Sequence, residues 1–233
     1  NLTLWRIDTT CLKKLFAIGL PAGGEFFLMF LYMATIYWLI QHFGADAQAG
    51  FGLGSRVMQA LFLPAMAIAF AAPAIAAQNF GAKNYQRVRE TFTWSAIMTC
   101  SLMSLLTIVC LWQAELLLLS FSTDKQVIVI SAAFLQIICW NFIPSGIVFT
   151  CSGMFQSLGN TWPGLLSTGA RLLAFIFPAL WLSNQANFQI EQLWYISVST
   201  VCFQALLSYY FLRREFKRRL PAELTTPTIT QLN

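Results

Sequence analysis

The sequence predicts an all-α membrane protein in which six helices span a bilayer. Of its 233 residues, 58% are hydrophobic and only 10% are charged, which is too little charge to cover the surface of a soluble domain of this length. Several apolar runs approach or exceed the roughly 18 residues that identify a membrane-spanning helix, and each contains at most one charge. Lys and Arg residues collect at alternate connections between these runs, as in polytopic membrane proteins.

The six predicted spans follow one another with short connections. Residues 1–14 form a polar, amphipathic lead-in, and about 24 apolar residues make the first span too long for the core of a cleaved signal peptide. Pro64 and Pro73 lie inside the second span and should kink it, whereas Asn79 and Gly81 should end it. The predicted spans cover residues 15–41, 47–78, 91–112, 127–158, 164–182 and 193–212.

Further local signals occur in the second half of the chain. Residues 115–119 are expected to form a short interfacial helix, and Pro144 lies within the fourth span. One of three residues should cap that span at its start: Ser122, Thr123 or Asp124. A tight turn before the fifth span is marked by Gly159, Asn160 and Pro163. Residues 221–233 are expected to form a polar, disordered tail.

The placement of basic residues supports the same six spans independently of hydropathy. Eleven of the 14 Lys and Arg residues fall on one side: Arg6, Lys13, Lys14, Lys83, Arg87, Arg89, Arg213, Arg214, Lys217, Arg218 and Arg219. The opposite connections contain only Lys125. Because cytoplasmic connections are enriched in Lys and Arg, both ends of the chain are expected in the cytoplasm, in a plasma membrane or bacterial inner membrane. The net charge of +5 follows from this arrangement and does not indicate a nucleic-acid partner.

Glu25 is the one acid inside the first apolar run. A carboxylate at the centre of a membrane helix is unfavourable by roughly 2.5 to 3.5 kcal/mol, so such residues usually have a function. Glu25 lies ten residues into its span, about 15 Å from the start and near the midplane, and Tyr32 follows two turns later on the same face. Desolvation favours the neutral acid, whereas a cation or a hydrated cavity favours the carboxylate. Glu25 is therefore a candidate site for coupling to protons or cations.

Polar residues form a stripe on the fourth span and a similar one on the sixth. The first stripe consists of Asn141, Ser145, Ser152 and Gln156, which fall within a sector of about 60° on a straight helix. It is either a wall of a water-accessible cavity or a set of small polar contacts between helices. The second stripe consists of Ser197, Thr200, Gln204 and Ser208. It has no charged neighbour in the sequence, which favours a packing role.

Two arginines lie inside predicted spans. Arg56 could reach the depth of Glu25 and pair with it, in which case Glu25 would stay ionised and could not act as a coupling site. Arg56 and Arg171 could instead extend to the membrane surface. Gln59 is a further candidate for lining a cavity.

No motif indicates an enzyme or a metal site. The sequence contains no P-loop, no HExxH and no GxSxG pattern, and its one histidine, His42, lies at the edge of a predicted span. No cofactor is therefore expected, apart from a coupling ion, H⁺ or Na⁺.

Three segments resemble the multidrug and toxic compound extrusion (MATE) family. They are GFGLGSRVMQALFLPAMAIAFAAPAIAAQNFGAKNYQRVRET at the second span, IGLPAGGE at the first, and GMFQSLGNTWPG between the fourth and fifth. The resemblance runs from about Arg6 to Arg214. Members of the family have twelve helices in two six-helix lobes, so this chain resembles the C-terminal lobe. Its first residue is Asn1 rather than Met, and we expect an N-terminal lobe of the same polypeptide as its partner.

The resemblance also implies an activity. The family exports cationic, often aromatic compounds in exchange for protons or sodium ions, and Glu25 occupies the place of an acid on the seventh helix that takes part in coupling in many members. Some sodium-coupled members carry another acid on the tenth helix, where this chain has Ser145. The resemblance therefore implies proton-coupled export through Glu25, with sodium as the alternative ion.

Two other functions remain open at this point. A flippase of the same superfamily would carry a lipid-linked oligosaccharide or a polyanion, and Arg56 and Arg171 would then face the cavity. A membrane scaffold without transport activity would use the polar stripes only to pack its helices.

Overall fold

The computed structural model describes residues 9–121, 124–185 and 188–220, and every regular element among them is a helix. Six helical segments are long and apolar enough to cross a membrane, which confirms the predicted class and number of spans. In chain order the elements are α1 (Thr9–Ile40), η2 (Gln41–Phe43), α2 (Ala45–Gly81), α3 (Tyr85–Leu119), α4 (Lys125–Ile138), η3 (Cys139–Asn141), α5 (Phe142–Ser157), α6 (Trp162–Ser183) and α7 (Ile190–Arg219). The predicted lead-in before Thr9, with Arg6, and the predicted tail from residue 221 lie outside the described residues.

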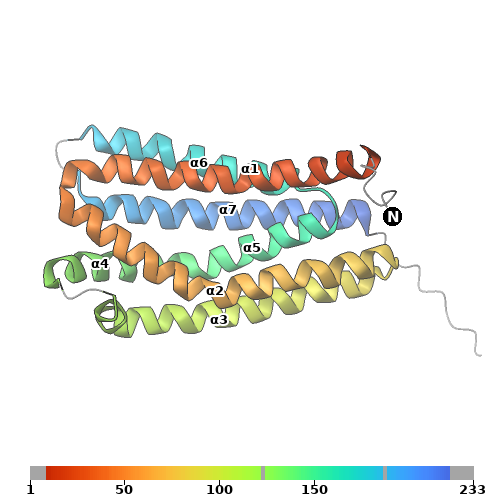
Figure 1. Ribbon diagram of the computed structural model, residues 1–233, viewed down its shortest axis with the longest axis horizontal. Coiled ribbons are helices and arrows are strands. Elements are labelled where there is room, and N and C mark those ends of the chain that lie inside the picture. The colour runs from red at the N-terminus through yellow and green to blue at the C-terminus, as the bar shows by residue number, and fades with distance from the viewer. Residues whose placement is uncertain (1–8, 122–123, 186–187, 221–233) are drawn as a thin grey trace, which may run out of the picture.

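The helices form one elongated bundle (Figure 1). Helices α1 and α6 run along one side and α2 and α3 along the other, with α7 and the α4–α5 pair between them. Helix α1 begins and α7 ends at the same end of the bundle, as an even number of spans requires. We call it the basic end, because the described basic residues from the connections on this side gather there.

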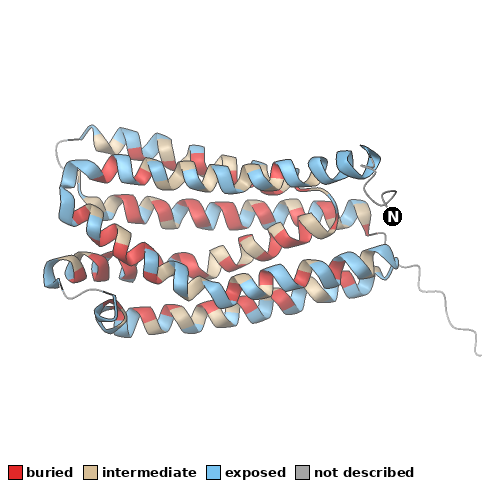
Figure 2. Ribbon diagram, viewed as in Figure 1, coloured by how far each residue is buried: buried red, intermediate tan, exposed pale blue. Residues whose placement is uncertain are grey.

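Burial follows the position of each helix in the bundle (Figure 2). Helix α7 presents buried residues along most of its length, including Trp194, which stacks on Phe51 of α2 at 5.4 Å between ring centroids. Helix α1 lies at the edge, and Phe26, Phe27 and Phe30 are more than half exposed. Large exposed apolar side chains are the expected outer surface of a membrane bundle, where lipid replaces water.

Helices α1, α3 and α7 extend beyond the predicted spans by about one or two turns, and the other helices by less than one turn. Helix α1 begins at Thr9, so the second half of the predicted lead-in is helical. Helix α3 continues to Leu119 and is interrupted only at Gln113, whose φ of −130° breaks the helix. The predicted short helix at residues 115–119 is therefore the end of α3 after a kink.

The helix ends use side-chain and backbone caps. The Asp124 carboxylate caps α4 by accepting from the Gln126 N–H at 3.0 Å, while the other two predicted caps, Ser122 and Thr123, lie outside the described residues. Helix α2 ends at Gly81 as predicted, but the residue in the left-handed region is Lys83, with φ of 59°. Gly159 does have a positive φ, 71°, at the predicted turn between α5 and α6.

Prolines affect the second and fourth spans differently. Helix α2 continues through Pro64 and Pro73, and its axis changes direction along the way (Figure 1). The fourth span is instead divided into α4 and α5 by the short helix η3, just before Pro144, which has no N–H to continue the α-helical pattern. The Thr107 hydroxyl donates to the Cys139 carbonyl at 3.1 Å and so compensates for the break. The fourth span is therefore not the single straight helix that the prediction of its polar stripe assumed.

Candidate functional site

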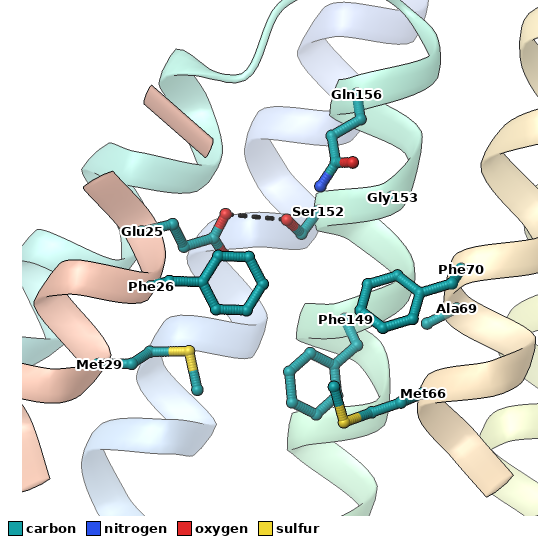
Figure 3. A pocket seen from close by; sticks show the side chains of 10 residues that line it. All are labelled: Glu25, Phe26, Met29, Met66, Ala69, Phe70, Phe149, Ser152, Gly153 and Gln156. Atoms are coloured by element: carbon teal, nitrogen blue, oxygen red, sulfur yellow. Dashed lines mark hydrogen bonds between the residues drawn. The ribbon is translucent and has the colours of Figure 1, made fainter. Parts of the chain in front are cut away.

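Glu25 of α1 faces α5 and α6 and accepts a hydrogen bond on each carboxylate oxygen. The Ser152 hydroxyl of α5 donates to Oε2 at 2.9 Å (Figure 3), and the Thr168 hydroxyl of α6 donates to Oε1 at 3.4 Å. Among the described residues, no Lys, Arg or His side chain forms an ion pair with Glu25. Its immediate polar environment consists of two neutral hydroxyls.

The start of α6 brings this helix close to Glu25. The Thr161 hydroxyl donates to the Ile18 carbonyl at 2.8 Å, so α6 begins level with Ile18 and Glu25 meets its first two turns. Gly164 makes the close approach possible, because a Cβ there would lie 3.0 Å from Oε2. Thr168 is six residues, about 9 Å, from the start of a helix about 33 Å long. Measured along α6, Thr168 therefore lies about 7 Å short of the middle of the helix, so Glu25 meets the half of α6 that starts at the basic end.

A pocket opens beside Glu25 between α1, α2 and α5 (Figure 3). The centre of a water molecule can occupy a volume of about 30 Å³ in this pocket, which is enough for one or two waters. Besides the Glu25 carboxylate, its walls carry mainly aromatic rings and thioethers. The residues that line it are Glu25, Phe26, Met29, Met66, Ala69, Phe70, Phe149, Ser152, Gly153 and Gln156.

The structure brings only part of the predicted polar stripe to this pocket. Ser152 and Gln156 line it with Glu25, as one interpretation of the stripe expected. Ser145 is half-buried about 10 Å from Ser152, two turns along α5. Asn141 belongs to η3 and is buried against α7, where its amide donates to the Ser197 hydroxyl at 3.2 Å. The break at η3 is the reason why the four residues do not form one wall.

The predicted candidates on α2 lie elsewhere. Arg56 and Gln59 are exposed and do not line this pocket, so their assignment as cavity-lining residues stays a prediction. Helices α1 and α2 are joined at the end opposite the basic end and then separate (Figure 1), so α2 does not carry Arg56 to Glu25. The ion pair considered between these residues is absent from the described part of the chain.

A second polar cluster lies between α1, α6 and α7, and the sequence did not predict that its residues meet. It consists of Tyr32, Thr168, Arg171, Ser197 and Gln204. Arg171 does not extend to the membrane surface. Its guanidinium lies 4.3 Å from the centre of the Tyr32 ring and donates to the Gln204 side-chain oxygen at 3.3 Å. The Gln204 amide donates in turn to Thr168 at 3.0 Å, and the Tyr32 hydroxyl lies 2.7 Å from the Ser197 hydroxyl.

This cluster corrects the interpretation of the polar stripe on the sixth span. The residues of the stripe are buried between helices as expected, but one of them, Gln204, does have a charged neighbour, Arg171. The signal that could have revealed this is the spacing of Gly164, Thr168 and Arg171, which share one face of α6 at offsets of four and seven. Sequence alone did not show that this face points at α7 and at Glu25.

Comparisons with known proteins can now be set beside this geometry. A family model described as MatE matches residues 21–181. The probable multidrug resistance protein YoeA of Bacillus subtilis is 22% identical over 215 residues, which cover 92% of this chain and 46% of that protein. A protein of Shewanella oneidensis described as an FAD transporter is 27% identical over 166 residues, covering 71% of this chain and 37% of that protein.

A solved structure shares the fold. The outward-facing conformation of a multidrug resistance MATE family transporter superposes with a TM-score of 0.85, at 16% identity, over 94% of this chain and 49% of that one. At this level of identity the likeness concerns the fold alone. The chain spans about half the length, or less, of the curated relatives and of the structure described here.

Proposed function

This chain belongs to the MatE family, and we propose that it forms one six-helix half of a transporter that exports small organic cations in exchange for protons. The observation that carries the proposal is Glu25 at the wall of an aromatic pocket, held by two hydroxyls and without a cationic partner among the described residues. A carboxylate in this setting can accept a positive charge from outside the protein, because no internal cation already neutralises it.

The chemistry of the residues that line the pocket, though not its present volume of about 30 Å³, suits a cationic, partly aromatic compound. The rings of Phe26, Phe70 and Phe149 can stack on an aromatic cargo and attract a cation through their faces. The thioethers of Met29 and Met66 are flexible and polarisable, so they can adapt to ligands of different shape. Together with the Glu25 carboxylate, these groups favour lipophilic cations over anions.

Exchange follows if a proton and the cargo compete for Glu25. A protonated carboxyl group is neutral and offers no charge to a cation, whereas the ionised group attracts one. In each half of the transport cycle, Glu25 would then carry either a proton or a cation, and the two would cross the membrane in opposite directions. Sodium remains the alternative ion, but Ser145, at the position of the second acid of sodium-coupled relatives, offers no charge and lies about 10 Å along α5 from Ser152.

The first prediction concerns Glu25 itself. In the natural full-length polypeptide, Glu25→Gln should abolish proton-gradient-driven export of a fluorescent organic cation from cells or vesicles, because glutamine can neither release a proton nor attract a cation. Glu90→Gln is the matched control, since Glu90 is an exposed acid on α3 that accepts a hydrogen bond from Gln86. Unimpaired export by Glu25→Gln, at equal expression, would refute the proposal.

An anionic cargo is the second candidate, and the description of the Shewanella relative as an FAD transporter favours it. For this function an arginine should face the pocket, yet Arg56 is exposed and Arg171 is turned toward Tyr32 and Gln204. Competition assays separate the two candidates. Inhibition of export by excess FAD but not by other organic cations would favour the anion.

The orientation in the membrane is also part of the proposal. We infer that the basic end faces the cytoplasm of the plasma membrane or bacterial inner membrane, because Lys and Arg are retained on that side. The scaffold alternative predicts no transport at all and is tested by the same export assay.

A further inference from the structure

We propose that Arg171 fixes the direction of a hydrogen-bond chain ending on Glu25, so that the coupling proton can bind only one carboxylate oxygen, the Oε2 that faces Ser152. Arg171 is thus a positioning residue that acts on Glu25 through Gln204 and Thr168. The inference rests on the proposed function for its role in coupling, but the placement of the proton can be measured without any transport assay.

Three hydrogen bonds make up the chain. Arg171 donates to the Gln204 oxygen at 3.3 Å, Gln204 donates through its amide nitrogen to the Thr168 oxygen at 3.0 Å, and Thr168 donates to Glu25 Oε1 at 3.4 Å. Thr168 and Gln204 are 4% and 2% exposed, so the bulk solvent has almost no access to the two central links.

The chemistry of the first residue dictates the direction of every bond. A guanidinium has only donors and stays protonated, so Gln204 must turn its oxygen toward Arg171 and its NH₂ group toward Thr168. Thr168 must accept this bond, and its single hydroxyl proton is left for Glu25. Oε1 is therefore always an acceptor, and a proton on Oε1 would face the Thr168 hydrogen.

The other carboxylate oxygen has no such constraint. Oε2 is bonded to Ser152, which lines the pocket together with Gln156, and the pocket has room for one or two waters. A serine hydroxyl rotates and can either donate or accept. When Glu25 binds a proton, Oε2–H can donate to Ser152 while the Ser152 hydrogen turns away. The chain thus leaves Oε2 as the position at which protons are exchanged with the pocket.

Arg171 is held in position by α1 rather than by an acid. Its guanidinium lies over the Tyr32 ring at 4.3 Å, and that ring is fixed by Phe175 in an edge contact at 4.8 Å and by Ser197. The Arg171 Nε atom is buried without a hydrogen-bond partner. The guanidinium therefore has few alternative acceptors, and its hydrogen bond to Gln204 is the contact through which it acts on its neighbours.

Few other groups could reverse this arrangement. The remaining charged residues of α1 and α7 lie toward the ends of these helices, and α5 has none. The exposed Arg56 of α2 lies apart from the hydrogen-bond chain. The nearby titratable side chains are the Tyr32 phenol, already bonded to Ser197, and Cys151, next to Ser152. Arg171 is accordingly the cation whose field and donor act on Glu25 through the chain.

Infrared difference spectroscopy of the full-length polypeptide in lipid vesicles tests the inference. The C=O stretching band of protonated Glu25 appears on acidification and is assigned by its loss in Glu25→Gln. If the proton is on Oε2, the carbonyl oxygen is Oε1, and Thr168→Val should raise the band frequency because a hydrogen bond to the carbonyl is lost. Gln204→Leu should broaden or split the band, because the Thr168 hydroxyl is then free to turn.

Variants of Arg171 and a control complete the experiment. Arg171→Met should behave like Gln204→Leu and also move the midpoint of the band's pH titration to higher pH, since a cation that favours the carboxylate is removed. Arg171→Lys keeps the positive charge and the hydrogen-bond donors, so the midpoint of its titration should lie close to that of the wild type. Ser208→Ala is the matched control, because Ser208 bonds Ser167 across the same two helices at 3.0 Å and lies outside the chain.

The outcomes are distinguishable. A band that is unchanged in Thr168→Val but raised in Ser152→Ala would place the proton on Oε1 and overturn the inference. The inference is also overturned if the band of Gln204→Leu and the band of Arg171→Met are both the same as that of the wild type. If no band is lost in Glu25→Gln, the residue does not titrate, and both this inference and the coupling role fail. If the band behaves as expected but no cation is exported, the placement of the proton stands and the proposed function, export of cations, is wrong.

Discussion

At the scale of single residues, the surroundings of Glu25 depend on small side chains. Ser152 and Thr168 are short enough to donate to the carboxylate from two different helices without filling the pocket. Gly164 leaves the space that the carboxylate occupies, so α6 can pass beside it. These small residues allow the acid to remain inside the bundle without a counter-charge.

Gly164→Ala should impair coupling more than stability. The added methyl group would lie 3.0 Å from Glu25 Oε2, so the carboxylate must shift by a few tenths of an ångström and lengthen its 2.9 Å bond to Ser152. We expect a several-fold loss of proton-driven export, corresponding to about 1 kcal/mol of weakened hydrogen bonding. Export rate as a function of pH, together with the melting temperature of the purified protein, measures the two effects separately.

Gly169→Ala provides the matched control for that substitution. Gly169 lies on the same helix, and a Cβ there would meet only Leu28 Cδ1 at an ordinary 3.7 Å. Equal losses of export in both variants would mean that α6 tolerates no added methyl group, and the specific role of Gly164 would be contradicted.

At the scale of helices, glycines set how closely α2 packs on its neighbours. Cβ atoms at Gly50 and Gly54 would come within 2.6 Å of Ile130 and 2.4 Å of Phe134, which places α4 directly on α2. Gly153 of α5 makes a similar contact with Pro73. Gly50 and Gly54 thus allow the start of α2 to pack closely on α4.

Gly153→Ala should destabilise the contact between α2 and α5. The methyl group would lie 2.7 Å from Pro73 Cγ and 2.9 Å from the Ala69 carbonyl oxygen, and neither atom is the end of a flexible side chain. Overpacking of this kind costs about 1 to 3 kcal/mol. We expect a lower melting temperature of the purified protein and a weaker response to organic cations, because Gly153 also lines the pocket.

Gly23→Ala is the control for the overpacked variant. Gly23 lies within α1, and a Cβ there would meet nothing within 4 Å. Replacing a helical glycine by alanine at an open position should be neutral or stabilising by up to about 1 kcal/mol. A melting temperature for Gly153→Ala at or above that of Gly23→Ala would contradict the packing argument.

The ends of α5, α6 and α7 are joined at the basic end. Glu215 is buried, forms ion pairs with Arg218 and Arg219, and accepts a bond from Asn160 at 3.0 Å. Arg219 also donates to the Leu158 carbonyl at 2.6 Å. These contacts hold the turn from which α6 starts, and the start of α6 determines which of its residues meet Glu25.

At the scale of the whole molecule, the positions of the two ends make the topology testable. In a background in which the six native cysteines are replaced, Asn184→Cys marks the connection between α6 and α7, and Arg87→Cys marks the start of α3 at the basic end. If the basic end is cytoplasmic, a membrane-impermeant maleimide should label the first variant in intact cells and the second only after permeabilisation.

The reverse pattern of labelling would place the basic end outside the cell and contradict the orientation. Labelling of both variants in intact cells would show that the two positions face the same side, which six spans do not permit. Both positions are exposed, so a lack of labelling in permeabilised cells would also count against the structure.

The sequence by itself determined the helical class, the number of spans, the gathering of basic residues at one end, and Glu25 as the acid of interest. These properties belong to single segments, because the cost of moving a residue into lipid depends on that residue and on its depth. The contacts of Glu25 depended on the tertiary structure. A straight fourth span would have aligned Asn141 with Ser152, but η3 separates them, and a pairing of Arg56 with Glu25 failed because α1 and α2 diverge. Arg171 contacts Tyr32 and Gln204 because α6 begins beside Ile18 and turns this face toward α1 and α7. The start and rotation of α6 are decided by packing between helices far apart in the chain.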